Sequence, residues 1–127
     1  MGAEARHAAP DDAAQRALTD LVAELDRCID ELDQARTRAE VLLRERRSGR
    51  QWLEIVTGES RPLIVERIST VLSALATAGH TWRREQAAAL QAEQVSINRI
   101  AALFGVTRQR ISALLKEPDA APAATGD

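Results

Sequence analysis

The sequence predicts an all-α fold, in which a long coiled-coil-like N-terminal helix precedes a short helix bundle. Two observations predict it. Aromatic residues make up only 2% of the 127 residues and tyrosine is absent, so the core must come from Leu, Ile, Val and Ala, as strong helix formers allow and as a β-sandwich or barrel rarely does. A heptad pattern of apolar residues also runs through the first third of the chain. With 13.9 kDa, the chain can bury one sizeable core.

The first helix is expected over residues 12–48. Asp11 or Asp12 can cap it, and no Pro or Gly follows until Gly49. Apolar side chains along it alternate at spacings of three and four residues, as in a coiled coil. The stripe consists of Leu18, Leu21, Leu25, Cys28, Leu32, Ala35, Ala39 and Leu42, and Val22, Ile29 and Leu43 widen it. A stripe of this width allows the helix to contact both a second copy and its own domain.

The stripe predicts a homodimer interface between antiparallel helices. Pairing centred near residue 30 sets large side chains against small ones, such as Leu21 against Ala39, whereas parallel pairing stacks each alanine on its own copy and leaves cavities. Antiparallel pairing also lays residues 11–35, with a net charge of −6, beside residues 36–50, with a net charge of +4. The alternative interpretation is that the stripe packs on later helices of the same chain.

The middle of the chain, residues 50–79, is expected to form connecting helices. An amphipathic turn precedes Gly58, and a second helix then begins with Ser60 as its cap and Pro62 in its first turn. Gly79 is expected to end that helix. A further helix should run from Trp82 to about Ala92 after a cap at Thr81, with Trp82, Ala89 and Leu90 on its buried face.

The segment from Ser96 to Lys116 has the most specific pattern in the chain. It contains a small residue, Ala101, four residues before Gly105, and Ser96 and Thr107 are in position to cap two short helices. Its apolar residues sit where two crossing helices would share a core: Ile100, Phe104, Val106, Ile111 and Leu114.

This pattern resembles the helix-turn-helix of bacterial DNA-binding proteins. The segment GVTRQRISALL is similar to the recognition half of sigma-factor region four and of serine-recombinase C-terminal domains. Among whole proteins, the chain most resembles small actinobacterial-type transcriptional regulators. The resemblance covers about 21 residues, or residues 81–117 if the preceding helix supports the motif. The other sigma regions and a recombinase catalytic domain are absent from the sequence, so no activity is carried over from them.

The resemblance implies that the helix beginning after Thr107 enters the major groove of double-stranded DNA. Arg108, Gln109 and Ser112 then match the base-contacting positions. The side chains suited to phosphate contacts are Ser96, Asn98, Arg99, Thr107, Arg110, Arg83 and Arg84. A local charge of +4 between Thr81 and Lys116 favours this interpretation, although the whole chain carries −2.

The predicted function is therefore that of a dimeric, sequence-specific DNA-binding protein, a transcriptional regulator of the bacterial cytoplasm and nucleoid. The alternative is an interaction or adaptor protein whose long helix binds a partner such as a sigma factor, a polymerase subunit or a toxin. A hybrid, in which a partner or small ligand acting on the long helix controls DNA binding, fits the same pattern.

The sequence also leads us to expect that several kinds of site and segment are absent. His7, His80 and the single Cys28 form no pattern typical of a catalytic or metal site, so we expect no enzyme, no cofactor and no metal. Cys28 is expected to pack in the apolar stripe rather than act as a redox group. No run of residues is apolar enough for a membrane helix or a leader. Residues 1–11 and 118–127 are expected to be disordered tails.

Overall fold

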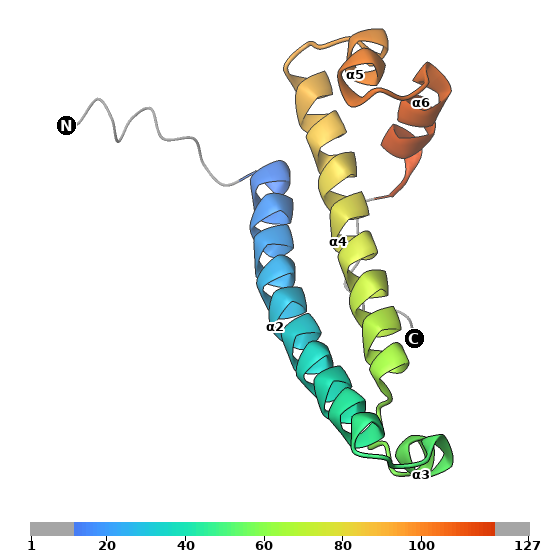
Figure 1. Cartoon of the computed structure of the whole chain (residues 1–127). Coiled ribbons are helices and arrows are strands. Elements are labelled where there is room, and N and C mark those ends of the chain that lie inside the picture. Colours follow the sequence, from blue (N-terminus) through green and yellow to red (C-terminus); the bar gives the residue numbers. More distant parts are fainter. Residues whose placement is uncertain (1–11, 119–127) are drawn as a thin grey trace, which may run out of the picture. The chain divides into compact units, whose positions relative to one another are not determined.

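The computed structural model describes residues 12–118, and all regular structure in this range is helical. The tails predicted at 1–11 and 118–127 therefore lie outside the described residues, except for Pro118. The helices are α2 (Ala13–Arg47), α3 (Trp52–Thr57), α4 (Ile64–Ala92), α5 (Ile97–Phe104) and α6 (Arg108–Lys116) (Figure 1). The predicted all-α class and the long N-terminal helix are confirmed. The described residues form two compact units, one of residues 21–78 and one of residues 12–20 with 79–118.

Helix α2 begins and ends where the sequence predicts. The carboxylate of Asp12 accepts a hydrogen bond from the backbone N–H of Gln15 at 2.7 Å, which satisfies one of the free donors of the first turn. The last turn carries Arg44, Arg46 and Arg47, whose positive charges suit the negative end of the helix dipole. The following Gly49 has a φ of 104°, a conformation that favours glycine.

In the unit of residues 21–78, α2 and the first half of α4 run antiparallel beside each other (Figure 1). Cys28 is only 3% exposed, and its Sγ lies 3.9 Å from the carbonyl oxygen of Val71 on α4. Arg67 of α4 donates to Glu31 of α2 at 3.1 Å. These contacts fix which side of α2 faces α4.

That side differs from the predicted dimer stripe by a small rotation of the helix. Cys28 and Ala35 are buried within the chain itself, so the prediction that they lie at a dimer interface is wrong. Leu21, Ala39 and Leu42 are half-buried, whereas Leu18, Leu25 and Leu32 remain exposed. The alternative interpretation, that the stripe packs on the chain's own helices, is thus correct for part of it.

Carboxylates, rather than Ser60, satisfy the start of α4. Glu59 accepts a hydrogen bond from the N–H of Ile64, and Glu66 accepts one from the N–H of Leu63, both at 2.8 Å. The carbonyl of Ser60 instead accepts a hydrogen bond from Arg38 on α2 at 2.8 Å. The predicted Ser60 cap is therefore wrong, and the segment is held by side chains on either side of it.

Gly79 does not end a helix. Helix α4 continues without a break from Ile64 through Gly79 and Thr81 to Ala92. A glycine inside a helix costs about 1 kcal/mol relative to alanine, which 29 residues of otherwise regular helix tolerate. The two helices predicted on either side of Gly79 are therefore one.

The thiol of Cys28 is expected to react slowly in the native protein. Burial raises its pKa, and the nearby carboxylate of Glu24, 3.5 Å from the Sγ, raises it further because the thiol donates to it. The reactive thiolate is thus scarcer at pH 8 than for a free cysteine. Labelling with a thiol reagent should proceed on the order of 100-fold faster in denaturant than in buffer. Equal rates in both would contradict the burial of Cys28.

No helix between residues 12 and 118 combines the length and the apolar character that crossing a bilayer requires.

Candidate nucleic-acid interface

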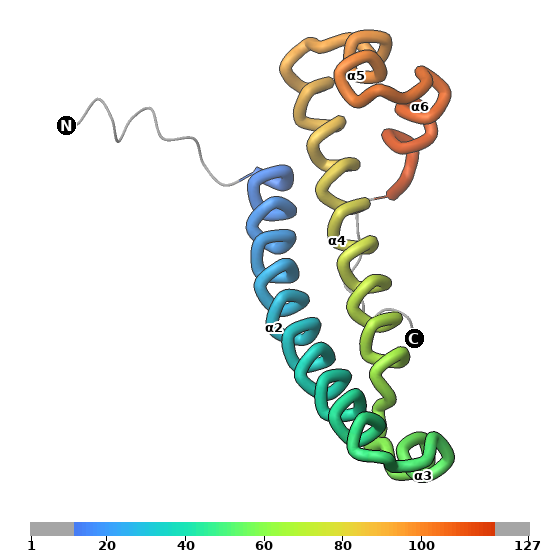
Figure 2. Tube along the Cα trace, in the orientation of Figure 1, coloured from blue at the N-terminus to red at the C-terminus, as the bar shows by residue number. Residues whose placement is uncertain are grey.

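Helices α5 and α6 pack against residues 79–92 of α4 around a small apolar core (Figure 2). The core consists of Ala87, Ile100, Ala101, Ile111 and Leu114. Leu90, Phe104 and Val106 are half-buried against it. The predicted shared core of the segment is confirmed. The sequence did not predict Ala87 as a core residue, because three consecutive alanines at Ala87–Ala89 do not indicate which side of the helix is buried.

The connection between α5 and α6 has the predicted caps and turn. The Ser96 hydroxyl accepts a hydrogen bond from the N–H of Arg99, and the Thr107 hydroxyl accepts one from the N–H of Arg110, each at 3.1 Å. Gly105 adopts the left-handed conformation, with φ 69° and ψ 33°. A Cβ there would meet no atom within 4 Å, so the backbone angle and not crowding favours glycine at this position.

The first turn of α6 presents its polar side chains to solvent. Arg108, Gln109 and Arg110 are all exposed, and Ser112, one turn further on, is half-buried. The side chains point outward because Ile111 and Leu114 fix the opposite side of α6 in the core. The structure therefore brings the predicted base-contacting residues together on the outer side of one short helix.

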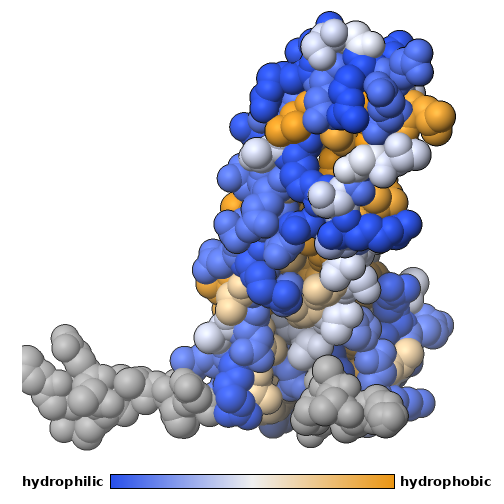
Figure 3. Space-filling view, turned by 90° about the horizontal axis from the view of Figure 1, so that it is seen from below, coloured by the Kyte–Doolittle hydropathy of each residue, from blue (hydrophilic) through white to orange (hydrophobic). Residues whose placement is uncertain are grey.

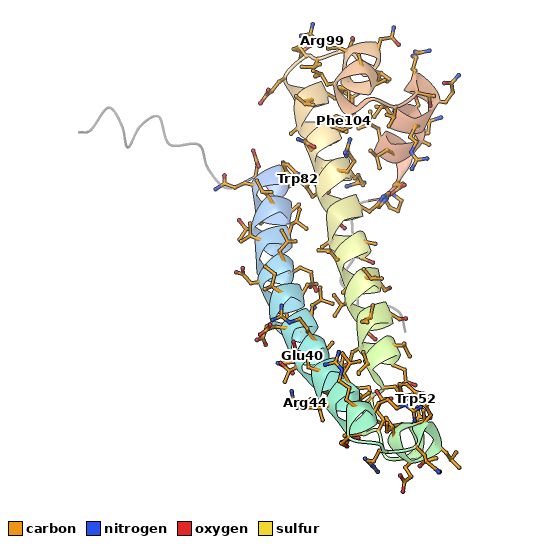
Figure 4. The ribbon with its side chains drawn as sticks, in the orientation of Figure 1. Glu40, Arg44, Trp52, Trp82, Arg99 and Phe104 are labelled. Carbon is orange, nitrogen blue, oxygen red and sulfur yellow. The ribbon has the colours of Figure 1, made fainter. Side chains whose placement is uncertain are left out.

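The predicted phosphate-contacting residues near the two helix starts are also exposed. Ser96, Asn98 and Arg99 lie at the start of α5, and Figure 4 shows Arg99 pointing away from the helices. Thr107 is exposed at the start of α6, next to Arg110. These positions offer hydroxyl, amide and guanidinium donors at helix N-termini, which suit anions.

Arg83 and Arg84 behave differently from each other. The guanidinium of Arg83 is exposed and lies 4.3 Å from the centre of the Phe104 ring, in a cation–π contact. Arg84 is only 8% exposed, pairs with Glu85 and donates to the carbonyl oxygen of Glu117 at 2.8 Å and 3.2 Å. The prediction that Arg84 contacts phosphate is therefore wrong, because its donors are directed inward at the end of α6.

The structural role of Arg84 had a weak signal in the sequence. Arg84, Ala87 and Leu90 are three residues apart on one side of α4, so the position falls on the buried face. His80, one turn earlier, lies with its Nε2 2.8 Å from the carboxylate of Glu117. His80 lies within α4, and its partner is 37 residues further along the chain.

Among residues 12–118, no three His, Cys, Asp or Glu side chains come together to form a possible metal site. No protein-family model, curated protein or solved structure matches the chain. A function for it is therefore proposed from its own residues.

Proposed function

We propose that the chain is a dimeric, sequence-specific DNA-binding protein, a transcriptional regulator in which α5 and α6 form a helix-turn-helix. One observation carries the proposal: Arg108 and Gln109 are exposed together on the first turn of a helix whose other side, at Ile111 and Leu114, is fixed in a core. Helix α6 has nine residues, which is long enough to lie in the major groove and short enough to present its N-terminal turn to base edges.

The chemistry of these side chains suits base recognition. The Arg108 guanidinium has two parallel donors for O6 and N7 of guanine, and the Gln109 amide has a donor and an acceptor for N7 and N6 of adenine. Ser112 lies one turn along the same side and can donate or accept. Ser96, Asn98 and Arg99 at the start of α5, with Thr107 and Arg110 at the start of α6, are assigned to phosphates.

Dimerisation belongs to the proposal because one short reading helix covers only one half-site. Two copies related by a two-fold axis read two half-sites, which multiplies affinity and specificity without any new kind of contact. The exposed leucines of α2 supply an apolar surface for a second copy. The overall charge of −2 predicts that non-specific DNA binding is weak and falls steeply with salt.

Replacing Arg108 by alanine is expected to weaken binding to the preferred duplex about 10- to 100-fold, because one bidentate base contact contributes roughly 1–3 kcal/mol. The duplex is first selected from a random pool by the purified full-length protein, and the affinity is measured by fluorescence anisotropy at 150 mM salt. The variant should also lose preference at one base pair in each half-site.

The matched control is Arg61→Ala, which removes the same side chain from the loop before α4, where Arg61 pairs with Glu66. This variant should bind almost as the natural protein does. If Arg108→Ala keeps both the affinity and the base preference, α6 is not the reading helix.

A specific observation also favours the alternative function, an adaptor whose long helix binds another protein. Val22 and Ile29 expose more than half of their surface on α2, beside the acidic residues Asp26, Asp30 and Asp33. The two functions separate by mutation, because Arg108→Ala should weaken the binding of a DNA reader and leave the partner binding of an adaptor unchanged.

A further inference from the structure

Helix α2 carries two neighbouring heptad rows rather than one. The row that faces α4 in the unit of residues 21–78 consists of Leu21, Glu24, Cys28, Glu31, Ala35, Arg38 and Leu42, all buried or half-buried. The second row lies one residue further round the helix and consists of Val22, Leu25, Ile29, Leu32, Arg36, Ala39 and Leu43. Its five large apolar members are all exposed. We call this second row the outer row.

Helix α4 extends the same apolar surface. A pocket of about 280 Å³ lies on one side of the α2–α4 pair and is lined by Glu24 and Glu31 of α2 and by Thr70 and Ala74 of α4. At 100° per residue, the outer row lies on the opposite side of α2 from Arg27, which also lines this pocket, and Leu72 and Val65 lie on the opposite side of α4 from Thr70. Both of these α4 residues are exposed. The outer row and two α4 side chains therefore form one face.

The size of this face indicates that it is covered in solution. Its seven large apolar side chains expose on the order of 600 Å², which is at the upper limit of what monomers leave uncovered. Figure 3 shows a surface that is mostly hydrophilic, with smaller hydrophobic areas among the hydrophilic residues. The outer row runs for three heptads, a length over which paired helices form a stable seam.

The charges beside the outer row determine what can cover it. Asp26, Asp30 and Asp33 line a shallow groove with Ile29 and Leu32. Arg36 lies within the outer row, and Arg44 lies beyond it on the same flank as the aspartates. Glu40 lies between these two arginines and pairs with Arg36 within the same chain at 3.7 Å. The flank thus carries three aspartates followed by two arginines, an order that suits an antiparallel second copy.

We propose that a second copy of this chain covers the face, with the two α2 helices antiparallel and centred at residue 34. In this register Arg36 of each copy lies level with Leu32 of the other and next to its Asp33, and Arg44 lies near Asp26 of the other. In two of the three layers a large side chain meets another leucine or a small residue, and in the third the aliphatic stem of Arg36 covers Leu32. The layers are Leu25 with Leu43, Ile29 with Ala39, and Leu32 with Arg36.

The neighbouring register, centred between residues 30 and 31, preserves the seam and sets Arg36 next to Asp26 of the other copy, but it moves Arg44 away from Asp26. It gathers Asp26, Asp30 and Asp33 of both copies around the two-fold axis, where like charges repel. The charge pattern therefore selects the centre at residue 34 over the centre near residue 30. This inference deepens the dimeric part of the proposed function, on which it rests, by giving the second copy a surface and a register.

Disulfide cross-linking tests the register with the full chain and without DNA. Leu25→Cys and Leu43→Cys are made in separate chains that also carry Cys28→Ala, and the two chains are mixed under mild oxidation. The proposal expects a mixed disulfide dimer that forms at least about ten times faster than with Leu18→Cys in place of Leu25→Cys. Leu18 is a matched control because it is 41% exposed, as Leu25 is, and because it meets Leu43 only in the register centred near residue 30.

Each other outcome overturns the proposal. Faster or equal cross-linking through Leu18→Cys selects the other register, and a monomeric mass for the natural chain at micromolar concentration removes the second copy. A dimer in which neither pair cross-links places the interface elsewhere.

A charge swap tests the pairs independently of added cysteines. Arg36→Asp should weaken dimerisation more than 10-fold, and adding Asp33→Arg in the same chain should restore it. Failure of the swap to restore the dimer contradicts the Arg36 and Asp33 pairing. The DNA-reading proposal is judged separately, by Arg108→Ala, so that the two can fail independently.

Discussion

Replacing Leu25 and Leu32 together by aspartate is expected to convert the protein into a monomer and to weaken binding to a two-fold-symmetric duplex by about 10²- to 10⁴-fold. The loss follows because a linked second reading helix acts at a high effective concentration that a monomer lacks. Both leucines are 41% exposed, so the substitutions leave the interior of the chain intact. They also add negative charge beside Asp26, Asp30 and Asp33, whose repulsion opposes any second copy. Sedimentation equilibrium gives the mass, and anisotropy gives the affinity.

The control for this variant is Leu53→Asp with Val56→Asp. Both residues are exposed on α3, away from the outer row, and the change adds the same charge and removes similar apolar surface. This control should remain a dimer. An unchanged mass and affinity in the Leu25 and Leu32 variant would show that α2 does not hold two copies together.

Replacing Ile111 by alanine is expected to lower the free energy of unfolding of the unit that contains α6 by about 2–4 kcal/mol. Ile111 is 0% exposed and belongs to the core that joins α5, α6 and residues 79–92 of α4. The smaller side chain leaves a cavity among Ile100, Ala101 and Leu114 that a core of five residues has little means to fill. Urea unfolding followed by circular dichroism measures the loss.

A second substitution separates burial from helix position. Leu103 lies on α5 and is 56% exposed, so Leu103→Ala should change the free energy of unfolding by less than about 1 kcal/mol. If Ile111→Ala lowers the free energy of unfolding by as little as Leu103→Ala does, the packing of α6 against α5 does not hold α6 in place. DNA binding by Ile111→Ala should fall with the folded fraction, whereas Arg108→Ala should remain fully folded.

The sequence was most informative where local chemistry decides the structure. Asp12, Ser96 and Thr107 cap their helices as predicted, because a cap depends only on the residue and the next two or three N–H groups. Gly105 takes the left-handed turn for an equally local reason. The core of α5 and α6 follows from the spacing of their apolar residues.

The side of α2 that faces α4 was not predictable in the same way. Its heptad row contains Glu24, Glu31 and Arg38, whereas the outer row has leucine or isoleucine at many of the corresponding positions. Hydropathy therefore favours the wrong row. The charged residues are acceptable beside α4 because they find partners far along the chain, as Glu31 does with Arg67 and Arg38 with the Ser60 carbonyl. Pairs separated by 22 and 36 residues leave no local pattern.

The continuity of α4 and the burial of Arg84 were missed for related reasons. Gly79 was predicted to end a helix because glycine often follows a helix C-terminus. Glycine is only a weak helix breaker inside a long helix, and α4 continues through Gly79. An arginine reads as a surface residue unless its partner is known. The partner of Arg84 is a backbone carbonyl, at Glu117, which any residue type would provide.

That contact has a consequence for the entropy of binding. The first turn of α6 is held by the Thr107 hydroxyl, and its last is held by the Arg84 guanidinium on the Glu117 carbonyl, so both ends of the helix are ordered in the free protein. A reading helix that is frayed before contact must lose about 1–2 kcal/mol of conformational entropy for each residue that it orders. Under the proposed function, α6 would therefore meet a duplex in its final conformation, with both ends fixed in advance. More of the energy of the proposed Arg108 and Gln109 contacts would then be left to distinguish one base sequence from another.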